Sequence, residues 1–97
     1  MDVINLKLLD EFRKQHADGR NPIQAWYEHV TRVIWNKPED VRNDYPKVSI
    51  VGNDRAVFNI KGNAYRLVVQ IDYTNHIVFI RFIGTHSEYN KVDASTI

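Results

Sequence analysis

The chain has 97 residues, of which 43% are hydrophobic and 11% aromatic, enough for one hydrophobic core and therefore one domain over residues 1–97. It contains no cysteine, which excludes disulfides and thiolate zinc sites. No apolar run approaches the ~20 residues that span a bilayer, and the N-terminus lacks the layout of a signal peptide. We therefore expect a cytoplasmic protein that does not contact membranes.

The charge balance argues against a protein that holds nucleic acid unaided. The formal net charge is +1. Residues 1–46 contain seven Lys and Arg against eight Asp and Glu, and residues 47–97 contain six against four. This asymmetry is too small for the chain to bind a polyanion strongly by itself. If the chain acts on RNA, we expect another molecule to help hold that RNA.

The first half of the chain has helical periodicity. Leu6, Leu9 and Phe12 recur at three- and four-residue spacings, which predicts a helix over residues 5–15. The short apolar segment before this helix, residues 2–4, is expected to form an edge strand. A polar break that contains a glycine then separates the first helix from a second one.

The second helix has clear start signals. Asn21 is a good N-cap, and Pro22 suits the first helical position, where its missing N–H costs nothing. The apolar residues that follow keep the 3.6-residue period and predict a buried stripe. A loop over residues 37–46, with one short helical turn, ends the helix. The stripe consists of Ile23, Trp26, Tyr27, Val30, Val33 and Ile34.

The second half consists of strands whose register follows from their side chains. A two-residue turn at Gly62 and Asn63, which both tolerate positive φ, pairs apolar residues across the first hairpin. A turn at Thr74 and Asn75 does the same for the second hairpin. Shifting either hairpin by one residue exchanges the faces and destroys the match. The expected pairs are Ile60–Tyr65, Phe58–Leu67, Ala56–Val69, Ile71–Val78, Val69–Ile80 and Leu67–Phe82.

The same register predicts the opposite face of the sheet. Asn59 lies opposite Arg66, and Arg66 itself pairs with Ile83. Because Val68 pairs with Arg81, Arg66 is a diagonal neighbour of Arg81. This face also carries apolar residues, so we expect something to cover part of it.

The residues after the last strand are typical of a helix start. Thr85 and Glu88 have the spacing of a capping box. His86 then occupies the first helical position, and Tyr89 lies on the same side three residues later. The whole pattern predicts an α+β fold in which two N-terminal helices pack on one face of a small antiparallel sheet, followed by a short C-terminal helical turn.

Two segments carry a resemblance to a known family. Residues 57–69 (VFNIKGNAYRLVV) and 80–89 (IRFIGTHSEY), together with Ala25-Trp26-Tyr27, closely resemble the HigB toxins of type II toxin–antitoxin systems. HigB proteins belong to the RelE-like superfamily, whose members share a fold of helices on an antiparallel sheet. The resemblance implies an mRNA interferase, a ribosome-dependent endonuclease that arrests translation. It also implies a cognate HigA-like antitoxin, a helix-turn-helix protein that binds operator DNA. The toxin is then expected to contact operator DNA only through this antitoxin.

A ribonuclease without metal or cofactor must deprotonate the 2′-OH, stabilise charge on the phosphorus and protonate the leaving 5′-oxygen. Arg66 and Arg81 are the candidate phosphate clamp, because a planar guanidinium matches phosphate oxygens. His86 is the candidate proton-transfer group, since an ordinary imidazole pKa of about 6.5 lies near working pH and a helix N-terminus disfavours the charged form. Tyr89 could stack on a base or donate a hydrogen bond to the phosphate.

Each of these assignments has a structural alternative. The two arginines can form surface ion pairs, His86 can simply start a helix, and Tyr89 can anchor the tail. Lys61 and Lys91 are assigned to RNA binding, although lone lysines are usually only solvated. Glu88 is assigned to the capping box rather than to catalysis.

Two other functions are compatible with this fold. ParE-like relatives are non-enzymatic toxins that inhibit DNA gyrase, and an interaction module without activity is also possible, because fold alone does not fix function. An acid–base candidate favours the nuclease, since a pure binder needs none. The sequence has no Gly-rich phosphate loop, metal-ligand spacing or nucleophile elbow, so we expect no cofactor or metal. The remaining histidines, His16, His29 and His76, are interpreted as structural.

Overall fold

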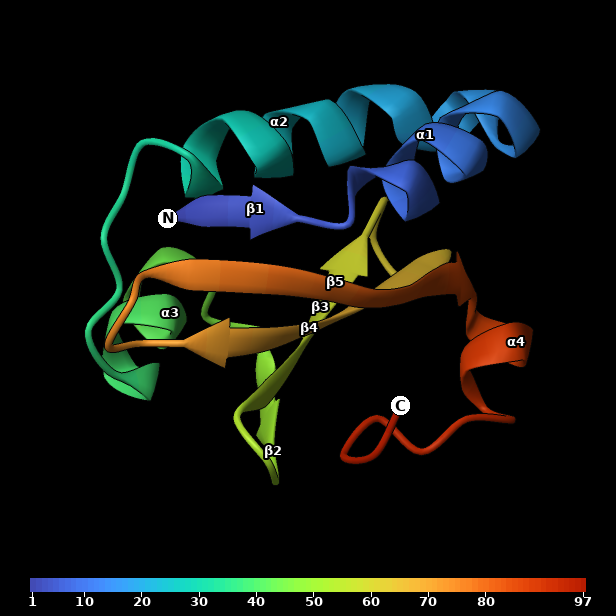
Figure 1. Cartoon of the computed structure of the whole chain (residues 1–97). Helices are drawn as coiled ribbons and strands as arrows, with labels where there is room; N and C mark the ends of the chain where they lie inside the picture. The colour runs from blue at the N-terminus through green and yellow to red at the C-terminus, as the bar shows by residue number, and fades with distance from the viewer.

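The computed structural model describes all residues 1–97 and contains a five-stranded sheet of order β1-β5-β4-β3-β2. Strand β1 runs parallel to β5, and the other neighbours are antiparallel. The α+β prediction is confirmed, as is the edge strand over residues 2–4 (Figure 1). None of the helices is long and apolar enough to cross a membrane. In chain order the elements are β1 (Asp2–Ile4), α1 (Leu6–Gln15), a 3-10 turn (Ala17–Gly19), α2 (Arg20–Val30), α3 (Pro38–Asp44), β2 (Ser49–Val51), β3 (Arg55–Ile60), β4 (Tyr65–Asp72), β5 (Ile77–Thr85) and α4 (His86–Tyr89).

Helices α1 and α2 cover one face of the sheet (Figure 1). Their apolar stripes meet alternate residues of the three long strands, and burial of this surface is the main source of stability. The core face predicted from strand alternation is confirmed for every residue except Phe82. Its members from the helices are Leu9, Phe12, Ile23, Trp26 and Val30, and those from the strands are Ala56, Phe58, Ile60, Tyr65, Leu67, Val69, Ile71, Val78 and Ile80.

Helix α2 begins and ends earlier than its pattern predicts. The 3-10 turn over Ala17–Gly19 leads directly into it, so Asn21 lies inside the helix and is not its N-cap. Pro22 remains in the first turn, where the missing N–H has no intrahelical partner to lose. The helix ends at Val30, and Ile34 lies beyond it with 62% of its surface exposed. Val33 still packs against the core from beyond the helix, so among the residues of the predicted buried stripe only Ile34 is wrong.

The β3–β4 hairpin has the predicted register, with Ile60 opposite Tyr65 and the other pairs following in step. Its loop differs in detail from a two-residue turn. The positive φ angles fall on Lys61 (52°) and Gly62 (61°), and Asn63 has none. The Ala64 N–H donates to the Lys61 carbonyl at 3.1 Å within this loop. The apolar pairs along the strands, more than the turn residues, therefore determine the register.

The β4–β5 hairpin follows the predicted register only as far as Ile80. Val68 then pairs with Phe82, which leaves Arg81 as the extra residue of a β-bulge. Beyond the bulge every partner on β5 is displaced by one residue. The predicted pairs Leu67–Phe82, Val68–Arg81 and Arg66–Ile83 are therefore wrong, and the observed pairs are Leu67–Ile83, Val68–Phe82 and Arg66–Gly84.

The bulge exchanges the faces of the last residues of β5. Phe82, predicted to lie in the main core, packs instead on the opposite, outer face of the sheet. Ile83 takes its place against the main core. Because one inserted residue reverses the alternation of side chains, both changes have the same cause.

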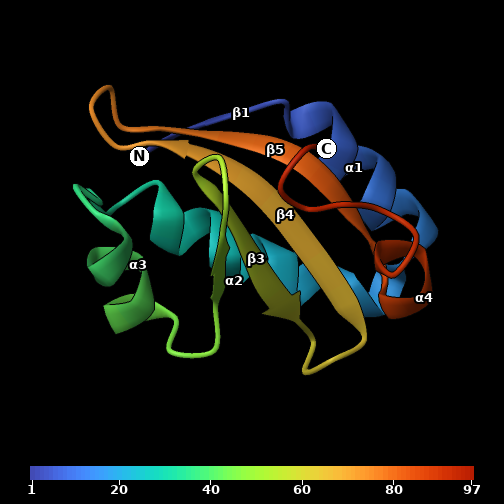
Figure 2. The same cartoon turned by 90° about the horizontal axis from the view of Figure 1, so that it is seen from below.

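The outer face is partly covered by the C-terminal tail, residues 90–97, which crosses back over the sheet (Figure 2). Ala94 from this tail forms a small buried cluster with Val57 and Val68. Arg55, only 6% exposed, donates to the Ile97 carbonyl at 2.7 Å and so holds the end of the tail. The expectation that something covers this face is confirmed.

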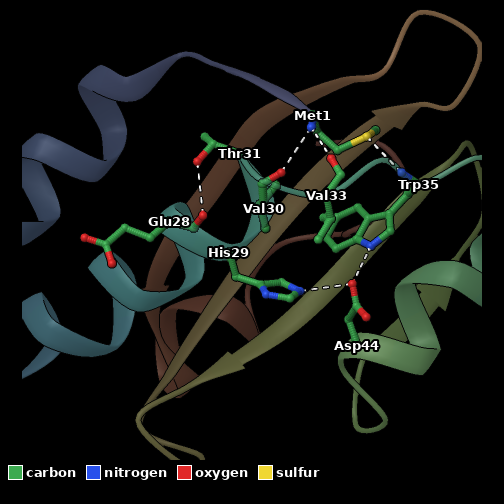
Figure 3. Close-up of polar contacts among 8 residues, drawn as sticks. All are labelled: Met1, Glu28, His29, Val30, Thr31, Val33, Trp35 and Asp44. Atoms are coloured by element: carbon green, nitrogen blue, oxygen red, sulfur yellow. Dashed lines mark hydrogen bonds and ion pairs between the residues drawn. The ribbon is translucent and has the colours of Figure 1, made fainter.

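The start of β1 is joined to the region after α2 by a set of polar contacts (Figure 3). The Met1 nitrogen donates to the Val30 carbonyl at 3.1 Å and to that of Val33, and the Trp35 N–H donates to the Met1 sulfur at 3.1 Å. The Trp35 indole in turn donates to Asp44 at 2.9 Å. These contacts hold α3 beside the core.

Leu67 tests the observed packing. It is fully buried and lies opposite Phe58 and Ile83. We expect Leu67→Ala to lower the free energy of unfolding by about 2–5 kcal/mol, because the smaller side chain leaves a cavity. Urea denaturation followed by circular dichroism measures the change. Asn43→Ala, at an exposed position of α3, is the control and should stay within about 0.5 kcal/mol of the parent chain. Equal losses for the two variants would contradict the packing.

Candidate active site

Arg66 and His86 both contact the β3–β4 loop at one end of the sheet. The Arg66 guanidinium donates to the Asn63 carbonyl at 3.0 Å and more weakly to that of Tyr65 at 3.3 Å. The His86 main-chain N–H donates to the Ala64 carbonyl at 3.2 Å. The His86 side chain is exposed and that of Arg66 partly so. The structure therefore places these two predicted residues at the same end of the sheet, with the Arg66 guanidinium and the His86 main chain bonded to neighbouring carbonyls.

Arg81 lies farther along the outer face. Its guanidinium donates to the Gln70 side-chain oxygen at 2.8 Å. Gln70 and Arg66 are four residues apart on β4, which corresponds to about 13 Å along a strand. The bulge moves the partner of Arg66 to Gly84, so the prediction that Arg66 and Arg81 are diagonal neighbours is wrong. Each guanidinium is bonded to its own partner, and the two do not form a ready clamp for one phosphate.

Helix α4 begins with the predicted capping box. The Glu88 N–H donates to the Thr85 hydroxyl at 3.2 Å, and the Thr85 N–H donates to the Glu88 carboxylate at 2.8 Å. His86 is the first residue of this helix. Gly84 allows the tight connection, because a Cβ at that position would lie 2.9 Å from the Glu88 carboxylate. The cap and the glycine together fix where His86 leaves the sheet.

Tyr89 and Lys91 lie where α4 passes into the tail. The Tyr89 ring is partly buried against the outer-face cluster, with its centroid 6.5 Å from that of Phe82. Lys91 is exposed two residues later. Tyr89 therefore anchors the tail, and its remaining exposed surface faces solvent near the end of the sheet that carries His86.

Lys61 is committed to another contact. Its ammonium bonds to Asp18 at 2.7 Å, and the Tyr65 hydroxyl donates to the other oxygen of the same carboxylate. The hydrogen bonds from Lys61 and Tyr65 lower the pKa of Asp18, and the bond to Asp18 raises the pKa of the Tyr65 phenol. His16 completes the group, with its Nδ1 at 3.4 Å from the Tyr65 hydroxyl. No local pattern predicts this network, because Asp18 and Lys61 are 43 residues apart in the chain.

His16 also lies near α4. It borders a small hollow of about 100 Å³ together with Gly84 and Glu88. The pKa of Glu88 is lowered chiefly by the Thr85 N–H and hydroxyl, and to a smaller extent by the charges of His16 and Lys91. A second histidine therefore lies beside the helix that carries His86, although the sequence gives no sign of this proximity.

These side chains can bind anions and move protons. Arg66 and Arg81 provide guanidinium groups on the outer face, and His86 adds an imidazole at the end of the sheet. Tyr89 adds an aromatic ring and a phenol nearby. The chain has no cluster of three or more His, Cys, Asp or Glu side chains that could hold a metal ion.

Helices on one face of a largely antiparallel sheet, with a short terminal helix, form the architecture expected of RelE-like toxins. A family model described as HigB_toxin, the RelE-like toxic component of a toxin–antitoxin system, matches residues 19–92. The chain therefore belongs to the HigB toxin family. The resemblance found in the sequence is confirmed, and the chain is a toxin of a toxin–antitoxin system.

Individual relatives cover almost the whole chain. The mRNA interferase HigB of Escherichia coli O6:H1 (strain CFT073) is 22% identical over 94 residues, 95% of this chain and 91% of that protein. The mRNA interferase toxin HigB of Escherichia coli K12 is 24% identical over 92 residues, 93% of this chain and 88% of that protein. The mRNA interferase HigB of Shigella flexneri has the same identity and coverage.

The capping box can be tested by titration. Because its partners stabilise the charged form of Glu88, we expect its carboxyl to titrate below the ordinary value of 4.5. Thr85→Ala removes the hydroxyl and should move the midpoint part of the way back. Carbon-detected NMR of the Glu88 side chain measures both midpoints. A Glu88 midpoint at or above 4.5 in the parent chain would contradict the observed cap.

Proposed function

We propose that this toxin is a metal-independent mRNA endonuclease. The observation that carries the proposal is the position of Arg66 and His86, which contact one loop at the same end of the sheet. A phosphate bound by Arg66 would lie within reach of an exposed imidazole. The names of the relatives, mRNA interferases of Escherichia coli and Shigella flexneri, support the same substrate class.

The proposed reaction uses the nucleophile that RNA itself carries. The 2′-oxygen attacks the adjacent phosphorus as its proton leaves, the bond from phosphorus to the 5′-oxygen breaks, and that oxygen takes up a proton. The products are a 2′,3′-cyclic phosphate and a 5′-hydroxyl. His86 transfers a proton at one of these oxygens, and Arg66 stabilises the charge that builds up on the phosphorane oxygens.

The other candidate site residues contact parts of the RNA strand beside the cleaved bond. The bulge separates Arg81 from Arg66, so in this proposal the two arginines contact different phosphates of one strand rather than the same one. Tyr89 stacks on a base or donates to the phosphate. Lys91 adds positive charge near α4, whereas Lys61 contributes only to the extent that it leaves Asp18.

In this proposal the ribosome supplies the affinity for RNA that the toxin surface lacks. A net charge of +1 gives weak general attraction to RNA, so the proposal requires mRNA held in the ribosomal A site. The toxin would then act in the cytoplasm, on translated messages. Its partner would be a HigA-like helix-turn-helix antitoxin that neutralises it and connects it to operator DNA.

Induced expression tests the proposed activity. We expect this chain alone to stop bacterial growth and to shorten mRNAs within translated regions, with reversal by the antitoxin. Purified toxin should cut A-site mRNA far faster than the same RNA free in solution, because the protein has little charge with which to hold RNA. Sequencing of RNA ends and a cleavage assay on programmed ribosomes measure these effects. DNA damage with intact mRNA would indicate a gyrase inhibitor instead, and equal rates on both RNA forms would contradict the charge argument.

Substitutions test the roles of the site residues. His86→Ala should reduce single-turnover cleavage by about 10²-fold or more, the size expected for general acid–base catalysis. Arg66→Ala should lose a comparable amount, and Arg66→Lys should not restore it, because the planar fork is lost. Arg81→Ala should weaken RNA binding more than the chemical step. Thermal melts provide the control, since none of these side chains belongs to the core. Cleavage by His86→Ala at the parental rate would contradict the proton-transfer role.

A further inference from the structure

A groove outside the candidate active site lies along the free edge of β3. Two adjoining hollows of about 430 and 330 Å³ form it and share Asp44, Tyr45 and Asn59. Helix α2 and the segment after α3 make its walls, and the end of β3 makes its base. The groove is large enough for a small planar ligand.

Asn59 presents its main chain to this groove. The Ile71 N–H donates to the Asp54 carbonyl at 2.9 Å, so the ladder bonds from β3 to β4 fall at the even-numbered residues of β3. The main-chain N–H and C=O of Asn59 therefore point to the other edge. Strand β2 pairs only with Arg55–Val57, so it offers Asn59 no partner there. One main-chain donor and one main-chain acceptor are thus free for a ligand, whereas the Asn59 side chain lies on the outer face with Val57.

The walls of the groove are aromatic and hold an unused donor. Trp26 borders the groove and is 2% exposed, yet its buried indole N–H has no hydrogen-bond partner. This unpaired donor is costly, but because the nitrogen is buried, a ligand in the groove would contact the Trp26 ring and not its N–H. Tyr45 lies edge-on to both His29 and Phe58, at centroid distances of 5.5 and 5.1 Å.

His29 is held in a fixed orientation at the rim. Its Nε2 lies 3.0 Å from the Asp44 carboxylate, which also accepts from the Trp35 indole at 2.9 Å (Figure 3). The His29 side chain remains 44% exposed. An oriented, half-exposed ring beside Tyr45 is suited to stack on a planar group, and exposed Lys47 adds a positive charge to the lining.

We propose that this groove binds one nucleobase of the RNA substrate and so contributes to the choice of cleavage site. A nucleobase combines a flat aromatic ring with donors and acceptors along one edge, which matches the aromatic walls and the free main-chain N–H and C=O of Asn59. The groove lies close to the candidate active site, because Asn59 is the cross-strand partner of Arg66. This inference rests on the proposed RNA substrate.

A peptide strand fits the groove less well. Strand addition needs a run of free main-chain groups along an edge. Here Asn59 is the only free ladder position of β3 beyond β2, and Lys61 leaves the extended conformation with a φ of 52°. A short free edge between aromatic walls therefore favours a single flat ring over an added strand.

NMR titration of the full chain tests the proposal. The chain has two tryptophans, so only two indole N–H signals are observed. With millimolar AMP, CMP, GMP or UMP we expect the Trp26 signal to move saturably for at least one nucleotide, while that of Trp35, already bonded to Asp44, moves less. His29→Ala should weaken this binding about tenfold or more, as expected for the loss of a ring that stacks on a base. Asn43→Ala, exposed on α3 and outside the groove lining, is the matched control and should bind as the parent chain does.

The outcomes separate this inference from the proposed function. An unmoved Trp26 signal, an equal effect of ribose 5-phosphate, or a shift caused only by the antitoxin would each overturn the base site. On programmed ribosomes His29→Ala should redistribute cleavage among codons, whereas Asn43→Ala should keep the parental pattern. If the parent chain cuts no mRNA but nucleotides still move Trp26, the proposed function fails and the base site stands.

Discussion

The β-bulge at Arg81 is the feature on which the arrangement of the outer face depends. Before the bulge, alternate residues of β5 face the helices in the register that the β4–β5 turn begins. The extra residue then reverses this alternation, so Phe82 turns to the outer face and Ile83 enters the core. Without the bulge, Phe82 would lie under the helices, and the outer cluster of Val57 and Val68 would lose a neighbour.

The bulge also determines how the end of the chain is placed. With Phe82 outside, Tyr89 has a ring to pack against, and the tail can close over the outer cluster through Ala94. Arg55 and Asn53 then hold the tail through the carbonyls of Ile97 and Ser95. The Tyr89 ring and the three contacts of the tail that follows therefore support a helix of only four residues, which could not hold its position by itself.

Sequence reasoning predicted what local rules control and missed what depends on distant packing. The register of β3–β4 and the cap at Thr85 were predictable, because apolar pairing and capping spacing involve near neighbours. The bulge was not, because β5 is apolar on both faces: either register places an apolar residue, Phe82 or Ile83, opposite Leu67. The predicted position of Arg81 relative to Arg66 depended on the register chosen for β4 and β5, and that register is wrong beyond Ile80. The contact of Lys61 with Asp18 had no local signal at all.

The folded chain leaves fewer free cations than its sequence suggests. Of the six basic residues in 47–97, Lys61 is paired with Asp18 and Arg55 is buried under the tail. The guanidinium groups of Arg66 and Arg81 are exposed in part, but they lie at separate positions on the sheet. General affinity for a polyanion grows with the number of phosphates that are neutralised together. Because its free cations are few and separated, this surface has little general affinity for RNA. Recognition by such a surface depends on positioned contacts with one segment of RNA, and the segment itself must be presented by a larger partner.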